Sequence, residues 1–356
     1  SCRIAQKVHT YSQIMKCKPK RKKEVVRRIV KSSLNSLIVL YLGSGTCLAD
    51  ESRKAELTEI VVSATRVAIN NPAGTYTSLA SNLRYNPVVE LQSRGMPEGQ
   101  SDVTARGSLF ENTGFKIGAS TIIDPQTGHY ATELPIASSS LSISDIALGI
   151  ENALSGFNAT VATVNYGINE IRSGGRVTLS GGSDSMNSQS IESGITRKTF
   201  LGRNTNFKVS AARSSGDGTL KNGDHQFKRV NLQIQRSHKE TQSDFFAAYQ
   251  DKFYGWPGAY TGFSIYPETD HTKTLLLLGN HKQELANGWW EIGGFYRRLR
   301  DNYDYDRRTQ ESGSPGSFDH ETRVFGASAR ARVDAKKLTW RLNTQISADE
   351  LTYSTD

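Results

Sequence analysis

The sequence predicts a mainly β protein in which a small mixed α/β domain precedes an antiparallel transmembrane β-barrel. The first observation is a hydrophobic period of two that begins near Gly174 and continues to the end of the chain. The second is the length of the alternating segments, roughly nine to eleven residues, which matches a tilted strand crossing a bilayer. The third is an alternation of connection lengths that is typical of outer-membrane barrels. Short turns at 181–187 and 334–337 alternate with long polar connections at 214–226, 252–271 and 301–321.

The first 49 residues carry the excess positive charge of the chain and predict a signal peptide. The chain of 356 residues has a net charge of +9, but residues 1–49 hold 11 Lys and Arg against one acidic residue, and the remainder holds 33 against 34. From Met15 a cationic run precedes an apolar segment at 34–42, and the small residues Cys47 and Ala49 predict cleavage after Ala49. The apolar segment is too short to span a bilayer. A basic amphipathic helix of a cytosolic protein is the alternative.

The charge distribution and the cysteine positions exclude several classes of function. A nucleic-acid-binding protein needs excess basic residues on its folded part, and the balanced charge after residue 49 does not supply them. All three cysteines, Cys2, Cys17 and Cys47, precede the predicted cleavage point. A mature chain without cysteine has no disulfide, no zinc–thiolate site and no cysteine nucleophile.

Three regions of different composition follow residues 1–49, which we expect to comprise upstream residues at 1–14 and a signal peptide from Met15. Residues 50–80 are polar with one strand-like run. Residues 81–173 mix short apolar segments with Gly, Ser, Asn and Pro, which predicts short strands and one helix at most. Residues 174–356 carry the regular alternation and predict about nine barrel strands.

The alternation gives each predicted strand one apolar and one polar face. In "VNLQIQ" at 230–235, Val, Leu and Ile alternate with Asn and Gln, and residues 325–333 and 338–347 follow the same pattern. Further strands are predicted near 175–183, 188–198, 205–213, 243–251, 272–282 and 288–299. A soluble β-sandwich would bury the apolar face, whereas a membrane barrel would turn it to lipid. Aromatic residues at 253–256, 289–290 and 303–305 favour the barrel, because such residues form girdles at membrane interfaces.

Four segments resemble the TonB-dependent receptors of Gram-negative outer membranes. "EIVVSATR" at 59–66 resembles the Ton box, "DVTARGSLF" at 102–110 a plug strand that ends in Arg-Gly, and "IIDPQTGHYATELPI" at 122–136 a plug loop. "YGWPGAYTGF" at 254–263 resembles a loop of cobalamin-receptor-like members. The resemblance implies a plug inside a barrel of about 22 strands. The barrel is incomplete here, so we expect the chain to be a fragment. Residues 145–175 depart from the family's usual segments before the barrel.

The resemblance also implies a partner for the strand-forming segment near the mature N-terminus. An exposed strand former is an aggregation hazard, but it is useful if it adds to the sheet edge of another protein. The implied partner is TonB, which transmits energy from the inner membrane. The alternative is a first strand paired within the plug. The implied TonB-binding residues are Ile60, Val61, Val62, Ser63, Ala64, Thr65 and Arg66.

No motif of an enzyme is found in the mature part. HExxH, GxSxG and glycine-rich phosphate-binding motifs are missing from the sequence, so we expect no catalytic activity. The histidines are too far apart to form a metal site, and no cofactor is expected. A calcium ion bound by Asp301, Asp304 and Asp306 in an outer loop is an alternative to an ordinary solvated loop.

We expect a ligand where plug loops meet outer loops. Pro125 and Gly128 flank polar residues that either contact the ligand or only shape a tight turn. Aromatic residues after Phe253 either grip a large ligand or belong to the interfacial girdle. The expected ligand-binding residues are Asp124, Gln126, Thr127, His129, Tyr130, Tyr254, Trp256, Tyr260 and Tyr266.

Together these features predict an outer-membrane receptor that takes up a large, scarce nutrient with energy supplied through TonB. Cobalamin or a ferric siderophore is the expected cargo, and the barrel is expected to contact outer-membrane lipid. A passive porin-like or structural barrel is one alternative. A soluble periplasmic β-sandwich binding protein is another.

Overall fold

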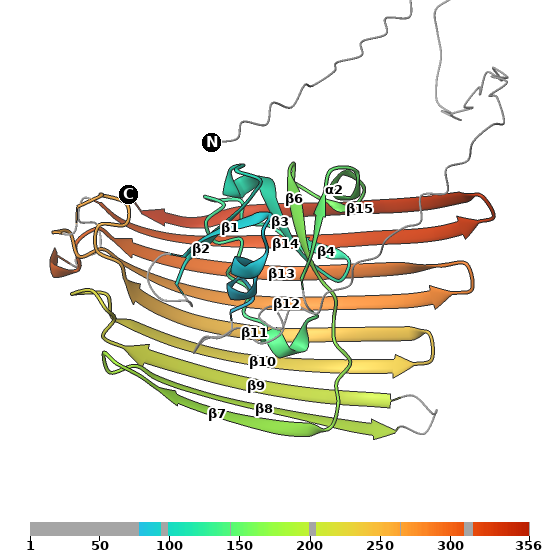
Figure 1. Cartoon of the computed structure of the whole chain (residues 1–356), viewed down its shortest axis with the longest axis horizontal. Coiled ribbons are helices and arrows are strands. Elements are labelled where there is room, and N and C mark those ends of the chain that lie inside the picture. The colour runs from blue at the N-terminus through green and yellow to red at the C-terminus, as the bar shows by residue number, and fades with distance from the viewer. Residues whose placement is uncertain are drawn as a thin grey trace, which may run out of the picture. The chain divides into compact units, whose positions relative to one another are not determined.

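A computed structural model describes residues 78–93, 99–142, 144–198, 204–263, 265–309 and 316–355. These residues form sheets of two, four and nine strands (Figure 1). We call the described residues from 78 to 173 the small domain and the nine-stranded sheet the large sheet. The predicted signal peptide and the predicted TonB-binding segment Ile60–Arg66 lie outside the described residues.

The small domain consists of short strands, single-turn 3-10 helices and a short α-helix. β1 and β2 form an antiparallel pair, and the other strands form a sheet in the order β4-β3-β6-β5 in which β3 and β6 are parallel. β2 and β3 are buried at every position, which is why the sequence shows no period of two there. No helix in the described part of the chain is long and apolar enough to cross a membrane. The elements are η1 (Ser81–Tyr85), β1 (Val89–Ser93), β2 (Ser101–Ala105), η2 (Phe110–Asn112), β3 (Thr113–Ile117), β4 (Ser120–Ile122), η3 (Ser138–Ser140), β5 (Asp145–Leu148), α2 (Ile150–Ser155) and β6 (Ala162–Tyr166).

The large sheet is an antiparallel meander in which each strand pairs with the next in sequence. The strands predicted from the alternation are all present, and most extend further than the pattern indicates. The elements are β7 (Gly174–Gly181), β8 (Asn187–Lys198), β9 (Asn204–Gly216), β10 (His225–His238), β11 (Thr241–Gly255), β12 (Thr269–Leu285), β13 (Gly288–Asp304), η4 (Arg307–Thr309), β14 (Ser317–Ala335) and β15 (Leu338–Thr355).

The two ends of the large sheet differ in their connections. Turns at 239–240, 286–287 and 336–337 define a short-turn end, and connections at 217–224, 256–268 and 305–316 define a long-loop end. The sequence grouped the turn at 181–187 with the short turns, but it lies at the long-loop end. There the amide of Asp217 donates to the carbonyl of Asp184 (2.8 Å).

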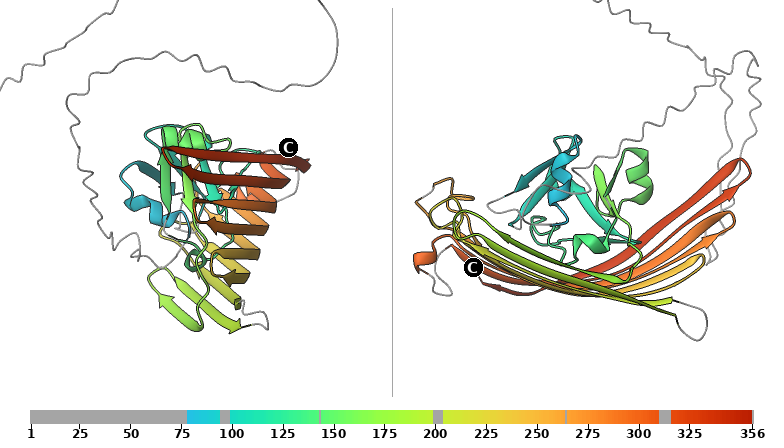
Figure 2. Two further views of the ribbon diagram at one scale, coloured as in Figure 1. Left: turned by 90° about the vertical axis from the view of Figure 1, so that its right-hand side faces the viewer. Right: turned by 60° about the horizontal axis from the view of Figure 1, so that its bottom comes forward.

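The apolar face of the large sheet is exposed and its polar face is buried. Val177 and Ile346 are 66% and 74% exposed, whereas Asn231, Gln233 and Gln235 are 0% exposed. The small domain lies on the concave side of the curved sheet and covers that polar face (Figure 2). A soluble protein buries its apolar face, so this arrangement fits a membrane barrel and not a sandwich of two sheets.

A central apolar patch on the inner face of the large sheet packs against the small domain. Phe246, Leu278 and Phe295 are buried and lie directly opposite one another across β11, β12 and β13. They belong to one hydrophobic cluster with Phe115 and Ile117 of β3. Burial of this patch holds the small domain against the large sheet, because apolar area removed from water is the main favourable term in packing.

The predicted aromatic girdle is wrong for several residues at the long-loop end. Tyr254 and Trp256 are 1% and 4% exposed and lie on the inner side. Tyr303 donates a hydrogen bond to Glu268 (3.0 Å) and contacts the ring of Tyr260. Sequence position near a strand end does not say which face a ring occupies, and here these rings face the small domain.

Candidate functional site

The hairpin of β3 and β4 is hydrogen-bonded to the polar face of the large sheet. The amide of Ala119 donates to Asn280 Oδ1 (2.9 Å). The amide of Thr121 donates to Gln345 Oε1 (2.9 Å), and Gln345 Nε2 donates back to the carbonyl of Thr121 (2.8 Å). The polar side chains that the strand pattern turns inward therefore pair with the backbone of the small domain.

A buried arginine of β13 holds the loop that follows β4. Arg297 is 1% exposed and donates to the backbone carbonyls of Ile123 (3.1 Å) and Tyr130. Its guanidinium also lies 3.6 Å from the Asp124 carboxylate, whose side chain is fully buried. The rigid guanidinium fork reaches both ends of this loop, which a lysine ammonium would not do.

A buried carboxylate of the small domain is paired with two side chains of β11. Glu133 accepts hydrogen bonds from Gln250 and forms an ion pair with Lys252. The side chains of Glu133 and Lys252 are 3% and 5% exposed. A buried ion pair is costly to break because the remaining charge is left without its partner. This pair therefore links the small domain to the wall.

A buried carboxyl of β12 binds one tyrosine from each part of the fold. Tyr130 of the small domain and Tyr254 of β11 both donate to Asp270 Oδ2, at 3.1 and 2.6 Å. Burial, together with the nearby Asp270 carboxyl, raises the pKa of Tyr130 well above its ordinary value. The phenol consequently stays protonated and remains a hydrogen-bond donor.

Aromatic rings connect the small domain to the connection at 256–268. His129 stacks on Phe110 (4.3 Å between ring centroids) and meets the edge of Tyr260 (6.0 Å). Tyr260 in turn contacts Trp256 (5.0 Å) and Tyr303 (5.3 Å), both edge to face. We call these five residues the outer aromatic cluster. Rigid aromatic surface of this kind suits a large organic ligand.

The outer aromatic cluster is held by carboxylates. His129 Nδ1 lies 2.9 Å from Asp102 Oδ1 of β2. Glu268 accepts from the amide of Tyr260 (2.9 Å) and from the hydroxyl of Tyr303 (3.0 Å). Tyr260 is 45% exposed, so the cluster presents this ring to solvent on a fixed support.

The long connections are tied to one another beside this cluster. Arg307 of η4 forms an ion pair with Asp224 of the connection at 217–224, and its amide donates to the carbonyl of Pro267 (3.2 Å). The hydrogen bond from Arg307 lowers the pKa of the Asp224 carboxyl. Three connections at the long-loop end therefore form one linked rim.

Solved structures of outer-membrane receptors share this architecture. A copper transporter, OprC, matches with a TM-score of 0.61 at 15% identity over 78% of this chain and 46% of its own. A mutant of the ferric enterobactin receptor PfeA from Pseudomonas aeruginosa matches with a TM-score of 0.56 at 14% identity, over 77% and 47%. The ferric yersiniabactin uptake receptor FyuA from Yersinia pestis matches with a TM-score of 0.54 at 12% identity, over 77% and 46%.

The described residues have the fold of the TonB-dependent outer-membrane receptors. From here we call the small domain the plug and the large sheet the barrel wall, after the parts of that fold. The chain spans about half the length of these solved structures. Neither a protein-family model nor a curated protein sequence matches the chain. The matched proteins are transporters and receptors rather than enzymes.

The receptor fold brings together five of the nine residues expected to bind ligand. His129, Trp256 and Tyr260 belong to the outer aromatic cluster, and Tyr130 and Tyr254 lie beneath it on Asp270. Trp256 contacts the ring of Tyr254 (5.3 Å), which joins the two groups. Only Tyr260 and His129 of this set keep an exposed surface.

The other four expected residues have different surroundings. Asp124 is buried beside Arg297 and fixes the plug loop. Gln126 is half-buried and Thr127 is exposed on that loop. Tyr266 contacts Tyr305 on the far side of its connection (5.6 Å). The glycine in the loop is also required, because Gly128 has φ +75° and an added Cβ would lie 2.8 Å from Glu111 Cγ.

The acidic residues considered for calcium have separate partners. Asp301 pairs with His320 (3.2 Å), Asp304 accepts from Ser317 (2.6 Å) and Asp306 pairs with Arg308 (2.5 Å). Among the described residues no group of three or more His, Cys, Asp or Glu side chains is placed to hold a metal ion.

Sequence reasoning missed the buried charged residues that link the plug to the wall. Glu133, Lys252, Asp270 and Arg297 were not singled out, although each carries a contact between plug and barrel. A signal did exist for the three strand residues. Each occupies the polar face of an alternating strand, where a barrel places its lumen side chains.

Proposed function

We propose that the chain is the plug and first part of the barrel of a receptor that takes up a large, scarce nutrient across a Gram-negative outer membrane. The observation that carries this proposal is the buried polar face of the large sheet, which is filled by a separate small domain (Figure 2). A passive porin has no need of a domain that fills its lumen. Uptake through such a receptor requires energy to move the plug, and TonB is the proposed source.

The proposed TonB-binding residues are Ile60–Arg66, and the test is their deletion. Cells that express the protein with residues 56–66 deleted are expected to bind cargo at the surface and to lose energy-dependent uptake. Uptake that continues at the same rate in these cells, or in cells treated with an uncoupler, would instead identify a passive barrel. A protein found in the soluble periplasmic fraction would identify a binding protein.

The proposed ligand site is the outer aromatic cluster together with the exposed part of the plug loop. Cobalamin and a ferric siderophore remain the two proposed cargoes. The similar solved structures are a ferric enterobactin receptor, a ferric yersiniabactin uptake receptor and a copper transporter, which supports including metal complexes among the ligands tested. The shared fold alone supports neither cargo over the other.

The site is tested by comparing two tyrosines of one connection. Tyr260→Ala removes the exposed ring of the cluster and is expected to weaken cargo binding roughly tenfold or more, as buried aromatic anchors do in interfaces. Tyr266→Ala is the matched control, because its ring contacts Tyr305 and not the cluster. Equal binding by the two variants would place the ligand elsewhere.

A further inference from the structure

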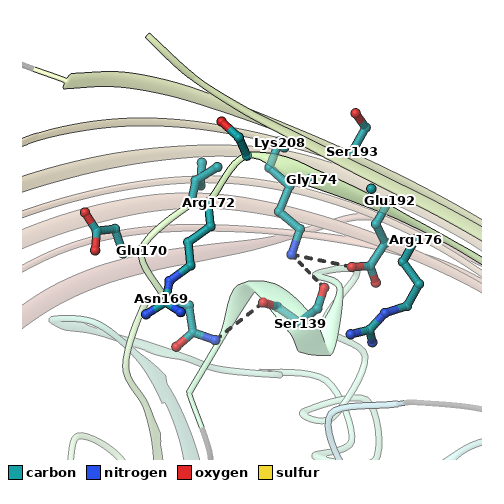
Figure 3. Close-up of a pocket in the computed structure, with 13 residues that line it drawn as sticks. Ser139, Asn169, Glu170, Arg172, Gly174, Arg176, Glu192, Ser193 and Lys208 are labelled. Carbon is teal, nitrogen blue, oxygen red and sulfur yellow. Dashed lines mark hydrogen bonds and ion pairs between the residues drawn. The ribbon is translucent and has the colours of Figure 1, made fainter. Parts of the chain in front are cut away.

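A cavity separate from the proposed ligand site lies at the short-turn end, where the plug joins the first strands of the barrel. Figure 3 shows the residues that line this cavity, which come from η3, from the linker at 169–173 and from β7, β8 and β9. Its volume is about 530 Å³, which is enough for a small organic molecule or a hydrated ion. We call it the linker pocket. Its lining includes the charged residues Glu170, Arg172, Arg176, Glu192 and Lys208 and the hydroxyl of Ser139.

Three cationic side chains project into the linker pocket. Figure 3 shows Lys208 between Arg172 and Arg176, with Glu192 beside the lysine. Lys208 Nζ donates to Ser139 Oγ (2.7 Å) and lies 3.7 Å from the Glu192 carboxylate. Within the described residues neither Arg172 nor Arg176 forms an ion pair with a carboxylate. The described lining therefore carries three cationic side chains against two carboxylates, Glu170 and Glu192, which leaves an excess of one positive charge.

The linker that carries Arg172 is fixed in place over the pocket. Gln235 accepts from the amide of Ile171 (2.8 Å) and donates to the carbonyl of Asn169 (2.9 Å). A Cβ on Gly194 would lie 2.4 Å from the carbonyl oxygen of Arg172, so the linker runs directly over a glycine of β8. A fixed backbone reduces the entropy lost when a ligand binds.

Another cavity at the short-turn end also contains cationic side chains, but its arginines are paired with carboxylates. A pocket of about 160 Å³ is lined by Lys116, Arg330 and Arg341 among others. There Arg330 pairs with Glu291 (2.5 Å) and Arg341 pairs with Glu151 (2.6 Å). Those arginines have carboxylate partners, whereas Arg172 and Arg176 form no ion pair with any carboxylate in the described part of the chain. The comparison identifies the linker pocket as the better anion site.

We propose that the linker pocket binds a soluble oxyanion, a carboxylate or phosphate group, held by Arg172, Arg176 and Lys208. Guanidinium groups bind such oxygens in bidentate geometry. The hydroxyl of Ser139 accepts from Lys208 and keeps its own hydrogen to donate. The pocket is on the plug side of the sheet, as the bond from Lys208 to Ser139 shows, and not on the face turned to lipid. A bound oxyanion would connect the plug linker to β7 and β9. This site rests on its own charges and does not depend on the proposed transport role.

The test is isothermal titration calorimetry of the intact protein in detergent with citrate and, separately, inorganic phosphate, at ionic strength held constant with chloride. One saturable site is expected for at least one of these anions. The double variant Arg172→Gln, Arg176→Gln is expected to bind roughly a hundredfold more weakly, at about tenfold for each charge-assisted contact removed. The matched control is Arg213→Gln, Arg236→Gln, which removes two exposed charges outside the pocket and is expected to bind normally.

A third variant separates loss of the site from loss of folding. Glu192→Gln removes the carboxylate that competes for Lys208, so it is expected to tighten anion binding several-fold, which a folding defect does not do. Equal affinity in the double variant and the native protein overturns the proposal. So does weaker or unchanged binding by Glu192→Gln, or heat that follows ionic strength alone.

Discussion

The ion pair between Glu133 and Lys252 offers the sharpest test of how the plug is held. Lys252→Met leaves the Glu133 carboxylate buried, at 3% exposure, with Gln250 as its remaining donor. Breaking a buried pair by removing one partner costs about 3–5 kcal/mol. At about 1.4 kcal/mol per tenfold, local opening of the plug becomes more frequent by roughly two to four orders of magnitude.

Hydrogen exchange measures this opening at the plug segment itself. The amides of Glu133 and Leu134 donate to the carbonyls of Tyr130 and Thr132, and mass spectrometry of that segment follows their protection. We expect Lys252→Met to speed exchange there while leaving the barrel strands protected. Opening of this segment is a local event, which is why exchange is a better measure than global unfolding.

A double-mutant cycle decides whether the pair itself is responsible. Glu133→Gln combined with Lys252→Met removes both charges and is expected to recover most of the lost protection. Arg300→Gln serves as a control, because its pair with Asp319 is 49% exposed on the arginine side and is worth about 1 kcal/mol or less. Exchange as fast in the double variant as in Lys252→Met would refute the reasoning, since the loss would then come from packing and not from an unpaired charge.

Three further predictions concern the loops. Arg297→Lys should lower the free energy of local opening of the plug loop by about 1–3 kcal/mol, because an ammonium cannot reach both carbonyls that the guanidinium binds. Hydrogen exchange of the backbone amides in that loop measures this change. Gly128→Val should weaken ligand binding more than Gly107→Val does. Both glycines have positive φ, but an added Cβ collides with neighbouring atoms only at Gly128. Equal ligand affinities of the two variants in a binding titration would contradict this prediction. The ion pair between Asp224 and Arg307 should be intact above the ordinary carboxyl pKa of 3.8 and should be lost as the pH falls through the lowered pKa of Asp224. A spin label on the loop that carries Asp224 should gain mobility only in that acidic range, and Asp224→Asn should be mobile at neutral pH.

Much of the barrel wall was predictable because its signal is local. Alternation along "VNLQIQ" assigns Val230 to one face and Asn231 to the other, and the structure confirms both assignments at 53% and 0% exposure. The plug was less predictable. Its strands β2 and β3 are buried on both faces, so they lack the period that identifies a strand beside lipid or water.

The candidate site was likewise predictable only in part. An aromatic loop and a polar plug loop were each identifiable in the sequence, but their contact through His129 and Tyr260 was not, since 131 positions separate them. The pattern also placed Tyr254 and Trp256 equally well at a membrane interface. Their burial against the plug decided that question, because a ring on the inner face has no access to lipid.

The sequence by itself determined the order of the parts, the number of wall strands in the described region and the face of the residues that alternate along each strand. It did not determine the face of the aromatic residues at the strand ends. These are properties of neighbouring residues, fixed by a period of two and by where the turns fall. Only the tertiary structure decided which polar side chains of the wall meet which groups of the plug, as in Lys252 with Glu133 and Arg297 with the loop from Ile123 to Tyr130. Those pairings depend on where the plug settles within the sheet, and that is set by the packing of its buried core against the apolar patch of β11, β12 and β13.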